Sequence, residues 1–175
     1  MTNEKIVFLK GKLYEAGGKK TTNVHIEDGE NEYKIECSQE EARELKDFLY
    51  RPIFLSTIKV TKSNYPPEYK LIDYYNSQEE QNKYEDFVQK IVENDTLEKY
   101  DLLHDKIYEF IDEDKINDIS KLIKVFNNNC TDRGVLRTIL ISLKPIIHNE
   151  TYKQLNSSYQ SLSELLRAGS SKKKI

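Results

Sequence analysis

The sequence contains no tryptophan, one methionine, three histidines and only two cysteines among its 175 residues. Cys37 and Cys130 stand far apart and lack the spacing of a metal-binding motif. They predict reduced thiols, which are typical of cytoplasmic proteins. No run approaches the ~18 uninterrupted apolar residues of a membrane span, and the N-terminus lacks the apolar core of a signal peptide. We therefore expect a cytoplasmic protein that does not enter a membrane.

Residue patterns that usually carry catalysis are also scarce. The three histidines form no metal motif such as His-Glu-x-x-His. Gly17-Gly18 precedes two lysines, but the spacing of a phosphate-binding loop is absent. The acidic run at 112–114 lacks the alternating acids and the glycine of a calcium loop. The sequence thus predicts a non-enzymatic protein without metal or cofactor, although a catalytic site assembled from scattered positions stays open.

Charge is distributed unevenly along the chain, whose net charge is −3. Residues 77–118 hold five Lys and Arg against fourteen Asp and Glu, whereas residues 119–175 hold ten against three. Two explanations stay open. The acidic and basic segments face each other, within the fold or across a dimer, or the basic end forms a surface for nucleic acid.

The first 76 residues carry an alternating hydrophobic pattern, which is typical of strands. Five strands are expected, at residues 6–16, 22–27, 32–37, 53–60 and 69–75. Two dipeptides that favour tight turns, Gly17-Gly18 and Asp28-Gly29, predict hairpins. Gly11, inside the first strand, predicts a bulge or a sharp bend.

One helix interrupts these strands, between the third and the fourth. Ser38 and Glu41 have the spacing of a capping box, in which each side chain binds the other residue's backbone amide. Leu45 and Phe48 continue an apolar stripe at helical spacing. Pro52 has no amide to donate and ends the helix.

The order of three strands, one helix and two strands resembles the OB-fold, a five-stranded Greek-key barrel. The resemblance covers residues 4–76 and rests on topology and on the position of Gly11, without a signature motif. Other small barrels and α+β meanders would give the same order. We expect an α+β protein whose residues 1–76 form a small OB-like barrel domain.

From Ser77 the hydrophobic period changes from two to 3.6 residues, which is typical of amphipathic helices. Four or five such stripes with short connectors predict a helical bundle domain at residues 77–167. Thr131 is expected to cap one of these helices. Residues 168–175, which end in three lysines, are expected to form a disordered basic tail.

In the OB-fold, ligands lie across strands two and three, between the loop joining strands one and two and the loop joining strands four and five. The resemblance therefore implies seven candidate residues for binding nucleic acid or a partner: Lys19, Lys20, His25, Tyr33, Lys62, Asn64 and Tyr65. Lysines that contact phosphates and aromatic rings that stack on bases suit single-stranded nucleic acid. Lysines in turns are also ordinary solvent-facing residues, and Tyr33 fits the core equally well.

Two functions stay open. The first is a non-enzymatic binding protein whose barrel recognises a protein partner, while the helical domain forms a homo-oligomer or docks on a larger protein. The second is a single-stranded DNA-binding or RNA-binding protein that uses the barrel loops. The composition, rich in Lys, Asn, Ile and Tyr, is typical of an AT-rich bacterial or phage genome. Small two-part proteins of such genomes are often accessory factors of mobile elements, including phage defence and counter-defence proteins.

Overall fold

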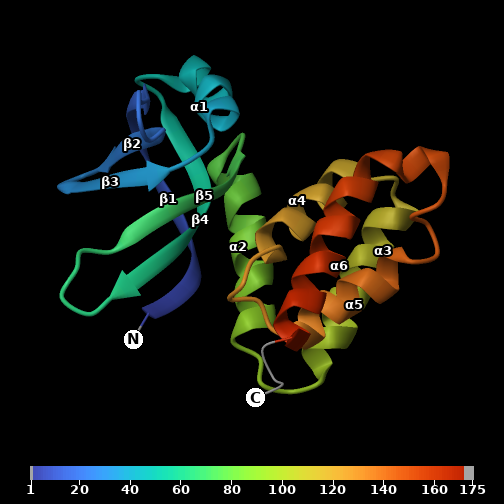
Figure 1. The fold of residues 1–175 in the computed structure, drawn as a ribbon. Coiled ribbons are helices and arrows are strands. Elements are labelled where there is room, and N and C mark those ends of the chain that lie inside the picture. The colour runs from blue at the N-terminus through green and yellow to red at the C-terminus, as the bar shows by residue number, and fades with distance from the viewer. Residues whose placement is uncertain (1, 172–175) are drawn as a thin grey trace. The chain divides into compact units, whose positions relative to one another are not determined.

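The computed structural model describes residues 2–171 and has a mixed α/β fold, with a five-stranded sheet at its N-terminal end (Figure 1). The sheet half contains β1 (Thr2–Gly17), β2 (Asn23–Asp28), β3 (Asn31–Glu36), α1 (Gln39–Leu45), the 3-10 turn η1 (Lys46–Phe48), β4 (Pro52–Lys62) and β5 (Glu68–Tyr75). The chain divides into two compact units, Met1–Glu85 and Asp86–Ile175. This division falls within α2 (Gln78–Val92), while the domain boundary expected at residue 76 stays a prediction.

The five strands close into a barrel in the order β1-β2-β3-β5-β4. β1 is long enough to pair with two neighbours, because residues 2–12 pair with β4 and residues 12–17 pair with β2. β3 and β5 run parallel and are joined only at Ile35–Tyr69 and Glu36–Lys70. The pairing between β1 and β4 is therefore extensive, whereas β3 and β5 pair over two residues each.

Gly11 lies where β1 passes from one neighbour to the other. A Cβ atom at Gly11 would lie 2.6 Å from the backbone oxygen of Glu27 on β2, which is closer than side-chain atoms approach backbone. Glycine is thus needed for the close approach of the two strands. The register shift between β1 and β2 lies further on, between Leu13 and Glu15, so the expected bulge is displaced from the glycine.

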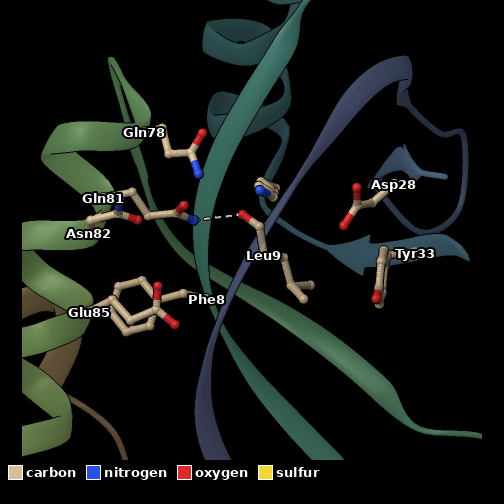
Figure 2. A pocket seen from close by; sticks show the side chains of 9 residues that line it. Phe8, Leu9, Asp28, Tyr33, Gln78, Gln81, Asn82 and Glu85 are labelled. Carbon is tan, nitrogen blue, oxygen red and sulfur yellow. Dashed lines mark hydrogen bonds between the residues drawn. The ribbon is translucent and has the colours of Figure 1, made fainter.

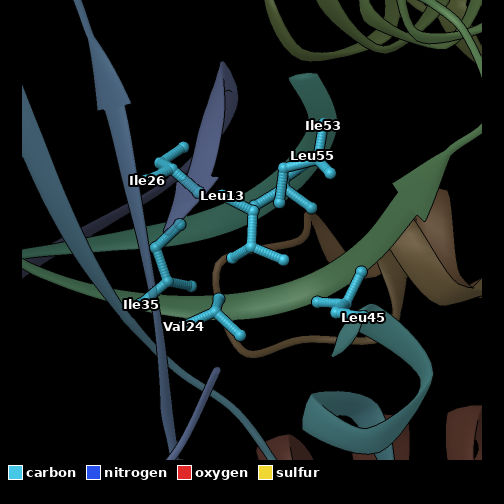
Figure 3. Close-up of a cluster of buried hydrophobic side chains, with 7 residues drawn as sticks. All are labelled: Leu13, Val24, Ile26, Ile35, Leu45, Ile53 and Leu55. Carbon is cyan, nitrogen blue, oxygen red and sulfur yellow. The ribbon is translucent and has the colours of Figure 1, made fainter. Parts of the chain in front are cut away.

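The barrel core is filled by aliphatic side chains from alternate positions of the strands (Figure 3). Its buried members are Leu13, Val24, Ile26, Ile35, Leu45, Ile53 and Leu55. All but Leu45 come from strands, and Leu45 projects into the cluster from α1. In β2, for example, the buried Val24 and Ile26 are separated by the half-buried His25, which is the period-two pattern of a strand with one face in the core.

The expected helix begins as predicted and changes its geometry early. The Ser38 hydroxyl accepts from the Glu41 amide at 3.1 Å, and the Ser38 amide donates to the Glu41 carboxylate at 2.7 Å, which confirms the capping box. The α-helix ends at Leu45, however, and the chain continues as η1. Phe48 is only half-buried and packs on the core from its rim.

The second half of the chain is helical throughout. It contains α2 and four further helices, α3 (Glu98–Asp112), α4 (Ile116–Phe126), α5 (Arg133–Leu143) and α6 (Asn156–Ser171), with the 3-10 turn η2 (Glu150–Leu155) before the last. The expectation of Thr131 as a cap is wrong, because the Asp132 carboxylate accepts from the Gly134 and Val135 amides at 2.7 and 3.1 Å. α6 continues to Ser171, into the expected tail, and residues 172–175 lie outside the described ones.

Candidate functional site

A cavity of about 270 Å³ lies against β1, and we call it the β1 cleft (Figure 2). Four elements of the Met1–Glu85 unit supply its lining: β1, β2, β3 and α2. The floor is Phe8, Leu9 and Lys10 of β1, one wall is Asp28 and Tyr33 of the β2–β3 hairpin, and the other wall is Gln78, Gln81, Asn82 and Glu85 of α2. The lining is mostly polar, which suits a ligand that forms hydrogen bonds.

The α2 wall is fixed by a buried glutamine. The side-chain nitrogen of Gln81 donates to the backbone oxygen of Leu9 at 2.7 Å (Figure 2). The same nitrogen donates to the backbone oxygen of Leu55 at 3.0 Å. Leu9 and Leu55 are paired across β1 and β4. Only 3% of Gln81 is exposed. Its bond to Leu55 is buried and its bond to Leu9 is partly buried, and an unmet carbonyl in a buried position is costly. Gln81 therefore ties the first turns of α2 to the barrel.

Aromatic rings support the same wall. Tyr75 lies 6.1 Å from Phe8 and 5.2 Å from Tyr84 between ring centroids, and its hydroxyl donates to Ser56 at 3.1 Å. Burial raises the pKa of Tyr75 far above its ordinary value, so its hydroxyl remains a donor. The α2 wall is thus a pre-formed surface on β1, β4 and β5.

The floor of the cleft is an incompletely paired strand. Within the described residues, β1 pairs with β2 only from Lys12 onwards, whereas its pairing with β4 extends from Thr2 to Lys12. In an antiparallel ladder, the N–H and C=O groups of alternate residues point away from the partner strand. Between Asn3 and Lys10, β1 therefore presents such groups on the side that no other strand of the barrel occupies.

The cleft lining carries two carboxylates, Asp28 and Glu85, against one ammonium, that of Lys10. The carboxylates stand on opposite walls, Asp28 on the hairpin and Glu85 on α2 (Figure 2). The hairpin that supplies Asp28 also carries Glu27, Glu30 and Glu32. Acidic residues therefore outnumber basic ones in the cleft lining.

His25 and Tyr33, which were expected to lie together, occupy opposite faces of the β2–β3 hairpin. His25 alternates with the buried Val24 and Ile26 and so faces outward, where its ring packs on Tyr14 at 5.7 Å. Tyr33 packs against the core, edge-on to Tyr69 at 5.4 Å. Of the seven candidate residues, Tyr33 is the one that lines the cleft.

Carboxylates outnumber cations on the outward face around His25, although Lys34 of β3 is the residue paired with His25. Partial burial raises the pKa of the Tyr14 hydroxyl, and the carboxylates of Glu32, Glu27 and Glu15 raise it further. Carboxylates at this density repel phosphate groups. The face that the OB-fold resemblance assigns to ligands is thus poorly suited to a nucleic-acid backbone.

The lysine and tyrosine candidates lie in two turns at the ends of strands. Lys19 and Lys20 are exposed between β1 and β2. Lys62, at the end of β4, contacts both oxygens of Glu68 at 2.9 and 3.0 Å. Asn64 adopts a positive φ of 68° in the turn that follows, where 70% of Tyr65 is exposed.

The sequence reasoning missed the α2 wall, although one signal was present. Gln81 is polar but lies three residues before Tyr84 and seven before Val88, on the apolar stripe of α2. A polar residue at a buried helical position must satisfy its hydrogen bonds within the fold. A buried polar residue such as Gln81 therefore indicates that its helix packs against backbone groups of a neighbouring element.

Neither a protein-family model nor a curated protein matches this sequence. In the described part of the chain, no three His, Cys, Asp or Glu side chains are grouped so that they would hold a metal ion. Among residues 2–171, no helix has the length and apolar character needed to cross a membrane. The geometry of the cleft therefore carries the functional argument.

Proposed function

We propose that this protein is a non-enzymatic binding protein that recognises a protein partner in the β1 cleft. The unpaired side of β1 is the observation that carries the proposal. Exposed strand edges accept an extended segment of another chain as an additional strand, with backbone hydrogen bonds supplying affinity and side-chain pockets supplying specificity. The cavity beside Phe8, Leu9 and Lys10 is the corresponding pocket.

Within this proposal the first half of the chain is an OB-like barrel and the second half a helical bundle. Strand order and the position of α1 support the OB-like assignment. A cytoplasmic accessory role in a bacterial or phage mobile element, such as phage defence or counter-defence, fits the composition of the chain. Formation of a homo-oligomer through the helical half belongs to the same proposal.

Hydrogen exchange of the full chain tests the proposed site. A random nonapeptide library displayed on phage is selected on the immobilised protein, and the strongest peptide is synthesised. We expect that peptide to slow amide exchange in residues 4–10 of β1, because an added strand occupies the N–H groups there. Protection only elsewhere, or failure to select any peptide, would reject the proposal.

A matched pair of peptides tests the strand geometry. Methylation of the backbone nitrogen removes a donor, and in an added strand only alternate residues donate to β1. One peptide is methylated at the odd positions and the other at the even positions. We expect one of them to lose binding and the other to keep it. Equal loss in both would rule out pairing as a regular strand.

A second candidate function, binding of single-stranded nucleic acid, rests on one observation. Arg43 and Lys46 of the α1 region line a smaller cavity beside Gly17 and Gly18, next to the turn that carries Lys19 and Lys20. Four cations in one region suit phosphate groups. An oligonucleotide titration, described in the Discussion, separates this function from the first.

A further inference from the structure

We infer that two copies of this chain form a two-fold symmetric dimer through the outer sides of α3 and α5, which we call the α3–α5 face. The inference rests on the homo-oligomer named in the proposed function and adds the surface that forms it. Every residue of this face lies in the Asp86–Ile175 unit.

The first step concerns the packing of α3 on α5 (Figure 1). The Tyr100 hydroxyl, in the first turn of α3, donates to the Asp132 carboxylate at the start of α5, at 3.1 Å. One turn later, Nδ1 of His104 lies 2.8 Å from Oγ of the fully buried Ser142, in the last turn of α5. The two helices therefore run in the same direction, and these contacts form a seam between them.

The α3 side of the face is acidic. Three exposed aspartates, at positions i, i+4 and i+11, share one side of the helix and form what we call the acidic row: Asp101, Asp105 and Asp112. The two lysines of α3 are engaged elsewhere. Lys106 donates to Glu109 at 2.7 Å, and the Lys99 ammonium lies 5.3 Å from the centroid of the Tyr100 ring.

The α5 side of the face is basic. Arg137 and Lys144, which directly follows the helix, are exposed and seven residues apart, so they share one side of it, and we call them the basic row. The sequence of α5 contains no acidic residue. Arg133 points elsewhere, because its guanidinium donates to the backbone oxygen of Leu166 at 3.1 Å.

Apolar side chains lie between the two rows. Ile141 is 67% exposed and, by helical spacing, lies between Arg137 and the seam at Ser142. Tyr108 is 38% exposed, and its ring centroid lies 4.4 Å from that of His104, so it borders the seam from the α3 side. The face thus has an apolar centre between charged edges, as protein interfaces commonly have.

The last step concerns symmetry. A two-fold axis parallel to the helices places α3 of one copy against α5 of the other, so that the acidic row meets the basic row twice. Asp105 and Asp112 are seven residues apart, as are Arg137 and Lys144, and seven residues of helix rise about 10.5 Å. Both ion pairs can therefore form together. This self-complementary charge identifies a second copy as the occupant.

Sedimentation velocity of the full chain, from micromolar to submillimolar concentration, tests the dimer. We expect a monomer–dimer equilibrium that higher salt weakens. Asp105→Lys and Arg137→Glu each place like charges opposite one another at two symmetric positions, and each should weaken the dimer about tenfold. Asp86→Lys, the same charge reversal at an exposed position of α2, is the matched control and should leave the equilibrium unchanged.

A mixture of the two reversal variants, Asp105→Lys and Arg137→Glu, tests the pairing itself. In a mixed dimer the introduced lysine faces the introduced glutamate, and the native Asp105 faces the native Arg137. We therefore expect the equimolar mixture to dimerise as tightly as the wild type. Ile141→Ser should weaken the dimer in every combination, because it removes the apolar centre. Thermal melts of each variant check that it keeps the fold.

The outcomes separate this inference from the β1 site. A wild-type chain that stays monomeric at submillimolar concentration would overturn the inference. A dimer unaffected by either reversal, or a mixture that fails to restore it, would also overturn the inference. None of these results alters strand addition, which is measured by the exchange of residues 4–10. Absence of peptide protection there would reject the β1 site and leave the dimer standing.

Discussion

The side-chain amide of Gln81 donates a 2.7 Å hydrogen bond to the backbone oxygen of Leu9, 72 residues earlier in the chain. A second bond from the same nitrogen reaches Leu55. One buried side chain thus joins a helix to two adjacent strands of the barrel, and it does so at the floor of the β1 cleft.

Replacement of Gln81 by leucine should destabilise the protein. The substitution keeps the volume and removes the donor, which leaves the Leu9 and Leu55 oxygens with one partner fewer in a buried position. We expect the free energy of unfolding to fall by about 1–3 kcal/mol, measured by urea denaturation. Gln89→Leu, the same change at an exposed position of α2, is the matched control and should have little effect. Equal losses would show that helix propensity rather than hydrogen bonding is responsible.

Two core substitutions should differ in their cost. Leu45 is fully buried in the barrel core, whereas Phe48 is half-buried and packs at its rim against Tyr74, at 5.8 Å between ring centroids. We expect Leu45→Ala to cost about 2–5 kcal/mol. Phe48→Ala should cost less, about 2 kcal/mol, because part of its ring is already in water. Urea melts of both variants give the order, and a larger loss for Phe48 would contradict it.

Cys37 should be a poorly reactive thiol. Burial raises its pKa to about 11, and the neighbouring Glu41 and Glu36 add to the shift. Because the thiolate is the reactive form, only about one molecule in a thousand is reactive at pH 8. In a Cys130→Ser variant, alkylation by iodoacetamide should be slow at pH 8 and should accelerate about tenfold per pH unit up to about pH 11. A rate that levels off near pH 9 would contradict this environment.

The raised pKa of Cys37 also makes the free energy of unfolding depend on pH. A thiol whose pKa is higher in the folded state than in the unfolded chain is protonated in both states below about pH 9, where its contribution is constant. Between about pH 9 and 11 the unfolded chain loses the proton first. Folding is then weakened as the pH rises, and Cys37→Ser should remove this part of the alkaline loss of stability.

Local sequence signals predicted the first half of the fold well. Alternation identified the strands, and the three-residue spacing of Ser38 and Glu41 identified the start of α1, because both signals depend on neighbours in the chain. The start of β1 was missed: its first residues, Thr2 to Lys5, are polar and exposed and belong to the strand through backbone pairing with β4. Backbone pairing leaves no mark on side-chain polarity.

The candidate site was harder to predict, because it depends on segments distant in sequence. Asp28 carries an ordinary turn signal, and Glu85 is one of many acids in an acidic segment. They become walls of one cavity only through the placement of α2 on β1 and β4, which Gln81 fixes. Lys62, a candidate for ligand binding, contacts Glu68 within the same turn region. Its selection rested on the position of a loop, and a loop position does not specify the partner of a charge.

The last prediction separates protein recognition from nucleic-acid binding. If the protein bound a single strand through the β1–β2 turn, Lys19 and Lys20 would each contact a phosphate. Each contact contributes about −0.7 to the slope of log affinity against log salt. A Lys19→Ala/Lys20→Ala variant would then flatten that slope by about 1.4, and Lys62→Ala would change it little because Glu68 already neutralises Lys62.

Tyr65→Ala would weaken binding at every salt concentration if its exposed ring stacks on a base. On the outward face of β2 and β3, Glu27, Glu32 and Glu36 outnumber the one lysine, Lys34, so we expect none of these effects. An anisotropy titration of the wild-type chain with a labelled oligonucleotide should show no binding at micromolar concentration and physiological salt. Binding that falls with salt and flattens in the double variant would instead establish the nucleic-acid function.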